Sequence, residues 1–224
     1  YVTEAKIQVS STRCAIDMPA GPSEVMVVAS PASNPAFVAS DLLSQAEHGR
    51  DSQAMLVIQG EKDAGVAFLD RVEEALDQQV SLLERQEFLT ESLASSRAFV
   101  VPSLASSSRL VNAYAPEHLI INLGEEEDDA LLSRVVNAGS VFLGPYSCES
   151  AGDYASGTNH TLPTNGWARS YSGVSTDSFL KKITVQKLNR EGLESLAPTL
   201  LCMAEQEQLR AHRNAVAIRL GGDI

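Results

Sequence analysis

Histidine and cysteine are both scarce in this chain. Its 224 residues include four histidines and three cysteines. Cys14, Cys148 and Cys202 lie far apart in the sequence and form no CxxC pair, which fits reduced thiols better than disulfides or a thiolate metal site. Any zinc site in this chain would therefore use histidine nitrogen and oxygen donors.

Basic residues are outnumbered, with 17 lysines and arginines against 29 aspartates and glutamates and a formal net charge of −12. This charge repels phosphate backbones and anionic lipid surfaces, so we expect neither nucleic acid nor a membrane as a partner. No apolar stretch reaches the length of a bilayer span, and the first residues show no signal-peptide pattern. We expect a cytoplasmic protein, or one of an organellar stroma in a eukaryote.

Two further signals are absent. The GxGxxG fingerprint of dinucleotide-binding folds does not occur, so the chain by itself carries no conventional dinucleotide signal. Tyr1 is not an initiator methionine, and residues 2–9 read as the last turns of a helix. We therefore expect further sequence upstream.

Apolar runs and helical stretches alternate along the first two thirds of the chain. We predict strands at 24–29, 54–59, 98–101, 118–122 and 140–143, separated by helices at 34–48, 61–80, 83–93, 104–114 and 126–136. Short strands without polar alternation, each followed by a helix, are typical of a parallel sheet covered on both faces. The predicted fold class is α/β with a Rossmann-like parallel sheet.

From residue 144 onward the alternation of apolar runs and helical stretches ends. Residues 144–173 are rich in Gly, Pro, Ser, Thr and Asn and predict a long binding loop. One short strand is predicted at 183–188, and two helices from Arg190 onward, divided near Pro198 or within 205–208. These last helices are predicted to form an arm.

Three of the four histidines stand beside polar side chains in segments that suit a metal-assisted site. Gln45 and His48, three residues apart, share one helix face and could bind one metal; alternatively, His48 contacts the helix end before Gly49. Glu117 and His118 could carry protons at the entrance of a strand; alternatively, both are solvated loop residues that point apart.

The other candidates lie in less regular segments. Asp153 and His160 follow small residues that let backbone approach a ligand, although a plain turn also explains the glycines. His212, taken alone, reads as a surface residue of an exposed helix. Ser23 ends a Pro- and Gly-rich segment before the first strand and could face a ligand.

Five motifs, in order, closely resemble histidinol dehydrogenase: Ile16–Glu24 (IDMPAGPSE), Ser40–Gly49 (SDLLSQAEHG), Ala115–Leu119 (APEHL), Ala138–Gly144 (AGSVFLG) and Glu149–His160 (ESAGDYASGTNH). The match runs along essentially the whole chain and corresponds to about the C-terminal half of that enzyme. It implies the NAD-dependent, zinc-assisted oxidation of L-histidinol through L-histidinal to L-histidine, in histidine biosynthesis.

The resemblance also assigns roles. Gln45, His48 and Asp153 would bind one zinc ion per subunit together with His212 of the other subunit of a domain-swapped homodimer. Glu117 and His118 match the acid/base pair, and Ser23, His160 and Glu207 match substrate contacts, so that all nine positions would surround L-histidinol. A turn must separate Glu207 from His212 if both are to converge. The NAD site would lie mainly in the absent N-terminal half.

The implied organisation is the end of a preceding domain at 1–15, the second part of an incomplete Rossmann-like zinc and substrate domain at 16–174, and a helical dimerisation arm at 175–224. Two alternatives remain open at this point. The chain could belong to a related zinc- and NAD-dependent dehydrogenase of another small alcohol, or be a non-catalytic zinc-binding dimerisation fragment.

Overall fold

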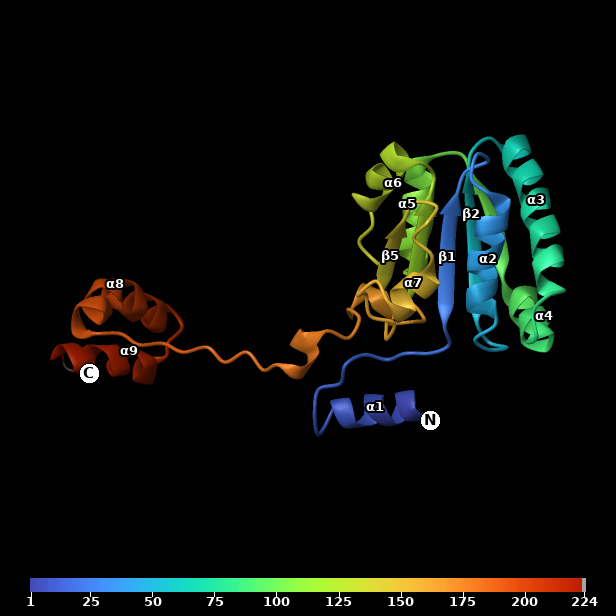
Figure 1. Cartoon of the computed structure of the whole chain (residues 1–224). Helices are drawn as coiled ribbons and strands as arrows, with labels where there is room; N and C mark the ends of the chain where they lie inside the picture. The colour runs from blue at the N-terminus through green and yellow to red at the C-terminus, as the bar shows by residue number, and fades with distance from the viewer. Residues whose placement is uncertain (223–224) are drawn as a thin grey trace. The chain divides into compact units, whose positions relative to one another are not determined.

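A five-stranded parallel sheet forms the centre of the fold. The computed structural model describes residues 1–222. Its strands are β1 (Glu24–Ala29), β2 (Gln53–Gln59), β3 (Arg97–Val101), β4 (His118–Asn122) and β5 (Ser140–Leu143), in the order β3-β2-β1-β4-β5. The predicted α/β class and parallel Rossmann-like sheet are confirmed (Figure 1).

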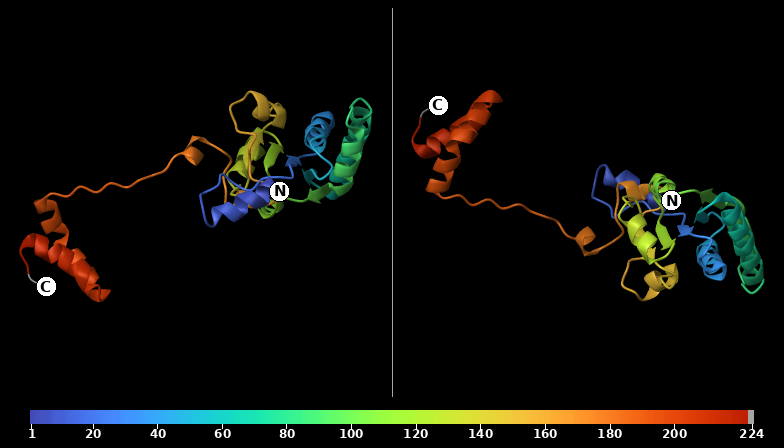
Figure 2. Two further views of the ribbon diagram at one scale, coloured as in Figure 1. Left: turned by 90° about the horizontal axis from the view of Figure 1, so that it is seen from below. Right: turned by 90° about the horizontal axis from the view of Figure 1, so that it is seen from above.

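Helices cover both faces of this sheet because successive strand residues point to opposite sides and both sides are apolar. On one face, β1 residues such as Val25 and Val27 pack with α2 (Pro35–Ala46) and α3 (Lys62–Val80). On the other face, Met26 and Val28 pack with α5 (Leu104–Tyr114) and α6 (Glu125–Leu132). Figure 2 views this layered arrangement from either end of the sheet.

Two helices end earlier than predicted. The helix expected at 126–136 stops at Leu132, because the Val136 N–H bonds to the Asn112 side chain instead of continuing a helical ladder. The helix expected at 34–48 stops at Ala46, so that His48 lies in the turn after α2. The short helix α4 (Gln86–Ser95) and the N-terminal α1 (Val2–Ser10) complete the regular elements before β5.

The predicted binding loop is not wholly irregular. It contains α7 (Glu149–Tyr154) and the single turn η1 (Trp167–Arg169), with a further turn, η2, at Thr176–Phe179. Gly152 lets α7 approach β5, since a Cβ atom there would come within 2.4 Å of the Phe142 ring. The prediction of a 30-residue loop without helix was wrong at α7, whose six residues are too few to show periodicity.

The chain divides into two compact units, Tyr1–Phe179 and Leu180–Ile224. The second unit holds α8 (Arg190–Gln206), α9 (Arg210–Ala217) and the turn η3 (Ile218–Leu220). The strand predicted at 183–188 is not formed: within the described part of this unit no other strand offers it hydrogen bonds. The bounds of the three predicted domains stay predictions.

Pro198 does not divide the two helices of this second unit, since α8 runs through it. The break falls instead after Gln206, where Gln208 takes a left-handed φ of 60°. Of the two predicted division points, the one within 205–208 is therefore correct. Among residues 1–222, no helix combines the length and apolar character needed to cross a bilayer.

Candidate active site and metal centre

The candidate site lies at the edge of the sheet where the strands begin. Parallel α/β sheets usually bind ligands at the opposite edge, beyond the carboxyl ends of the strands. Here β1 begins at Glu24 and β4 at His118, and α2 runs back against the strands so that its C-terminal end returns to this edge. The short helix α7 lies at the same edge (Figure 1).

Glu117 and His118 form a buried pair, exposed by only 5% and 3%. A Glu117 carboxylate oxygen accepts the Glu24 N–H at 2.8 Å, and His118 Nδ1 donates to the Glu24 carbonyl at 3.2 Å. The Glu117 oxygen and His118 Nδ1 are 3.6 Å apart. The alternative of two solvated residues pointing apart was wrong, because Glu117 precedes the strand and strand alternation does not apply to it.

Two features of the neighbouring backbone, at Ala115 and Gly139, fix the position of this pair. Ala115 ends α5 in a left-handed conformation with φ 59°, which turns the chain sharply into β4. The neighbouring chain passes so close that a Cβ atom on Gly139 would lie 2.5 Å from the Glu117 carbonyl oxygen. Glycine at position 139 therefore permits the close approach that seats Glu117.

Burial shifts the pKa of both Glu117 and His118. Burial, followed by the negative charges of Glu24 and Asp153, raises the pKa of Glu117 to about 8, although the Glu24 N–H opposes this shift. Burial lowers the pKa of His118. The ring is therefore neutral near pH 7, and because Nδ1 carries the proton given to the Glu24 carbonyl, Nε2 is left as the basic atom.

Gln45 and His48 meet as predicted, although His48 lies beyond the helix. The Gln45 side chain is fully buried, while His48 is exposed. The Gln45 amide can be oriented so that both its oxygen and its nitrogen have hydrogen-bond partners. In that orientation its oxygen accepts from His48 Nδ1 at 2.8 Å. The alternative also holds in part, because the His48 backbone N–H caps the helix at the Gln45 carbonyl.

Helix α7 brings two carboxylates to this pair. Ligand atoms of His48, Glu149 and Asp153 all lie within 4.8 Å of one another. Asp153 Oδ1 is also 3.6 Å from His118 Nε2, and neither of these buried atoms has a hydrogen-bond partner among residues 1–222. Asp153 thus links the Glu117 and His118 pair to the predicted metal ligands.

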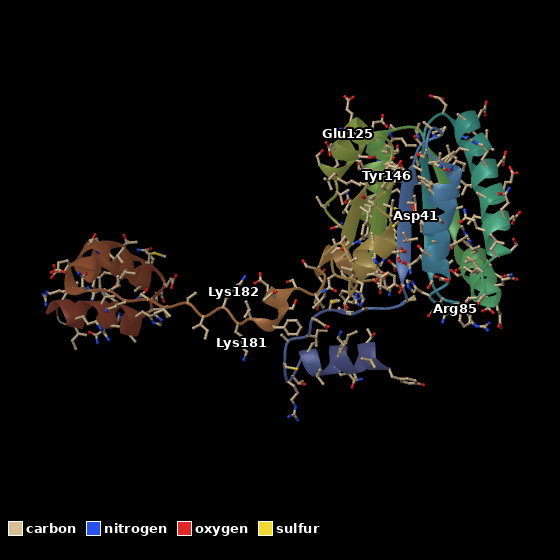
Figure 3. The ribbon with its side chains drawn as sticks, in the orientation of Figure 1. Asp41, Arg85, Glu125, Tyr146, Lys181 and Lys182 are labelled. Atoms are coloured by element: carbon tan, nitrogen blue, oxygen red, sulfur yellow. The ribbon has the colours of Figure 1, made fainter. Side chains whose placement is uncertain are left out.

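The residues present fit a bound zinc ion. Imidazole nitrogen, carboxylate oxygen and amide oxygen are suitable donors. The buried Asp153 Oδ1, which has no hydrogen-bond partner among residues 1–222, lies 3.6 Å from His118 Nε2. Burial and neighbouring acidic groups raise the pKa of Glu149 to about 9, and burial raises that of Asp41, one turn before Gln45, to about 7 (Figure 3). A divalent cation would stabilise so many buried carboxyl groups in their charged form.

These pKa shifts predict a pH-dependent stability of the metal-free chain. Carboxyl groups that ionise near pH 4 when unfolded but near pH 7 to 9 when folded favour the folded state at low pH. We therefore expect the metal-free protein to lose at least about 2 kcal/mol, or roughly 4–8 °C in Tm, between pH 6 and 9. Calorimetry with saturating zinc should show a flatter pH profile; an unchanged Tm without metal would contradict the burial of these acids.

The remaining predicted residues are not drawn into this cluster. Ser23 is half-buried just before β1, where its carbonyl accepts the Gln53 N–H, and His160 is exposed in the loop after α7. In the second unit, the turn after α8 brings Glu207 and His212 onto one hollow of about 250 Å³, as their predicted convergence requires. Their roles stay predictions.

Sequence reasoning missed three buried acids of this region: Glu24, Asp41 and Glu149. Asp41 and Glu149 fall on helices and Glu24 on a strand, where acids normally face solvent. Glu149 stands four residues before Asp153, a spacing that places both on one face of α7. This spacing was the one signal in the sequence that could have identified Glu149.

Comparison with known proteins agrees with this site. Residues 1–220 match the family model of histidinol dehydrogenase. The chain is 54% identical over 220 residues to the histidinol dehydrogenase of Bacteroides fragilis, covering 98% of this chain and 50% of the relative. It is also 54% identical over 222 residues to the chloroplastic histidinol dehydrogenase of rice (Oryza sativa subsp. japonica), covering 98% of this chain and 46% of the relative.

A solved structure gives the same result. The crystal structure of histidinol dehydrogenase from Elizabethkingia anophelis matches with a TM-score of 0.91 and 51% identity, covering 99% of this chain and 49% of that one. The chain thus spans about half the length of the relatives that it matches. It belongs to the histidinol dehydrogenase family.

Proposed function

We propose that this chain forms the zinc- and substrate-binding half of an NAD-dependent L-histidinol dehydrogenase. The reaction is the four-electron oxidation of L-histidinol through L-histidinal to L-histidine, in histidine biosynthesis. The chain belongs to this family, and one observation supports the proposal most strongly. The buried Glu117 and His118 pair lies next to Asp153, which is itself a member of the possible metal-binding cluster with His48.

In this proposal Gln45, His48, Asp153 and His212 of a second copy hold one zinc ion per subunit. Zinc, when bound, supplies a template for the imidazole and amino nitrogens of histidinol. Ser23, His160 and Glu207 complete the substrate contacts. NAD acts as a co-substrate that binds mainly to the half of the enzyme outside this chain, and the enzyme works in the cytoplasm or an organellar stroma.

His118 serves as the proton acceptor of the first half-reaction. Its Nδ1 is held by the Glu24 carbonyl at 3.2 Å, and its basic Nε2 faces the side where Asp153 lies. With NAD bound to take the hydride of the carbinol carbon, this Nε2 would accept the alcohol proton. Burial keeps the ring neutral and ready to accept that proton.

Glu117 serves in the second half-reaction, which consumes water. The aldehyde must be hydrated before it can lose a second hydride, and a carboxylate with a pKa of about 8 is well matched to remove a proton from that water near neutral pH. Its contact with the Glu24 N–H at 2.8 Å fixes the carboxylate in place.

The test is an assay for histidinol-dependent NADH formation. It uses the family-length enzyme, by which we mean a protein in which this chain is joined to the remaining half that its relatives have. We expect two NADH per histidinol, loss of turnover after chelation, and recovery with zinc. Preference for another amino alcohol or diol would favour a related dehydrogenase. Zinc binding without any turnover would favour a non-catalytic fragment.

A further inference from the structure

The Gln45 amide has two orientations, and its surroundings distinguish them. In one, the amide oxygen accepts from His48 Nδ1 at 2.8 Å, while the two hydrogens of the nitrogen face the Glu149 carboxylate oxygens, both at 3.2 Å, and the Glu24 carbonyl at 3.1 Å. His118 Nδ1 lies 3.3 Å from the same nitrogen, but its own proton goes to the Glu24 carbonyl, so it is not an acceptor here. In the other, the amide oxygen would face the Glu24 carbonyl and both Glu149 oxygens, and Glu149 in the charged form that a bound cation favours has no proton to donate. The first orientation is therefore favoured.

This choice matters because only the oxygen of an amide can bind a cation; its nitrogen has no free lone pair. The terminal torsion of glutamine is broad and roughly two-fold, so the side chain itself does not select the ligand atom. Groups that hold the outer side of a metal ligand commonly set both its orientation and the metal affinity. Glu149 touches the outer side of Gln45.

Glu149 is well placed for such a role. Its side chain is only 1% exposed, and Gly152 allows α7 to pack directly against the Phe142 ring. One turn further along α7, Asp153 supplies a predicted zinc ligand. A single short helix therefore delivers one ligand and one group that contacts another ligand.

We propose that Glu149 is a positioning residue of the metal site, one that holds the Gln45 amide with its oxygen toward the cation. This inference rests on the proposed zinc site and adds a residue to it. It differs from direct ligation by Glu149, which the 4.8 Å cluster would also accommodate. An orienting role and direct ligation by Glu149 predict different zinc affinities when residue 45 is a glutamate, because a carboxylate presents an oxygen to the cation in either orientation.

The experiment measures zinc affinity of the full chain by competition with a chromogenic chelator. Glu149→Leu should weaken zinc binding by about 10–100-fold, as loss of such an outer contact commonly does. Glu149→Gln, whose amide oxygen can still accept from Gln45, should stay within about threefold of the unmodified chain. Equal, large losses in both variants would overturn the proposal in favour of direct ligation.

The matched control is the same change in a Gln45→Glu background. A carboxylate presents oxygen whichever way it turns, so adding Glu149→Leu should there cost less than about threefold. The same 10–100-fold loss in both backgrounds would overturn the orienting role.

The Tm of each variant without zinc shows whether it is folded. If Glu149→Leu is unfolded, Glu149→Met takes its place. An unmodified chain that binds no zinc would contradict the proposed function itself, whereas normal binding by Glu149→Leu would contradict this inference alone.

Discussion

His118→Ala is expected to lower the rate of histidinol oxidation by the family-length enzyme about 10²–10⁴-fold, the usual range for loss of a positioned general base. The reason is local: the Glu24 carbonyl holds Nδ1, and Nε2 is the basic atom left to take the alcohol proton. Single-turnover measurements with histidinol and with histidinal separate the two half-reactions. The loss should fall mainly on the alcohol.

Glu117→Gln is the companion variant and should impair mainly the oxidation of histidinal, because the amide cannot remove a proton from water. Glu125→Gln, an exposed position at the far edge of the sheet, is the matched control and should leave both rates unchanged (Figure 3). Equal losses in both half-reactions for His118→Ala and Glu117→Gln would contradict the division of roles.

His48→Asn should release zinc from the site, with an affinity lower by about 100-fold or more, since loss of a direct ligand exceeds the effect of an outer contact. The remaining donors would be the oxygens of Gln45 and Asp153 and a single imidazole, that of His212 of a second copy. Zinc content after dialysis gives the measurement. His160→Asn, which replaces another exposed histidine, should keep its zinc. Full metal content in His48→Asn would refute its role as a ligand.

The strands could be predicted from the sequence because each is a short apolar run, and the three central strands, β1, β2 and β4, are buried on both faces. Residues 24–29 are a clear case, since all six are buried. The same reasoning failed at 183–188, because β-branched residues make a strand only when a neighbouring strand pairs with them. Local pattern also misjudged Pro198, which α8 tolerates in its interior.

The candidate site could be predicted only in part. Its histidines and their polar neighbours were visible because histidine is so rare in the chain. Glu149 was not, because its importance comes from packing: Gln45 on α2 and Glu149 on α7 are 104 positions apart in the sequence, and only the folded chain brings them together. The same holds for Glu24, whose backbone fixes both Glu117 and His118.

The central claim is that Gln45, His48 and Asp153 bind one cation. Anomalous diffraction at the zinc edge, from crystals grown with zinc, tests it most directly. We predict one peak per copy, about 2.0–2.2 Å from a donor atom of each of the three residues, with His212 of a second copy as the fourth ligand. A zinc peak elsewhere, with these three side chains unliganded, would contradict the account.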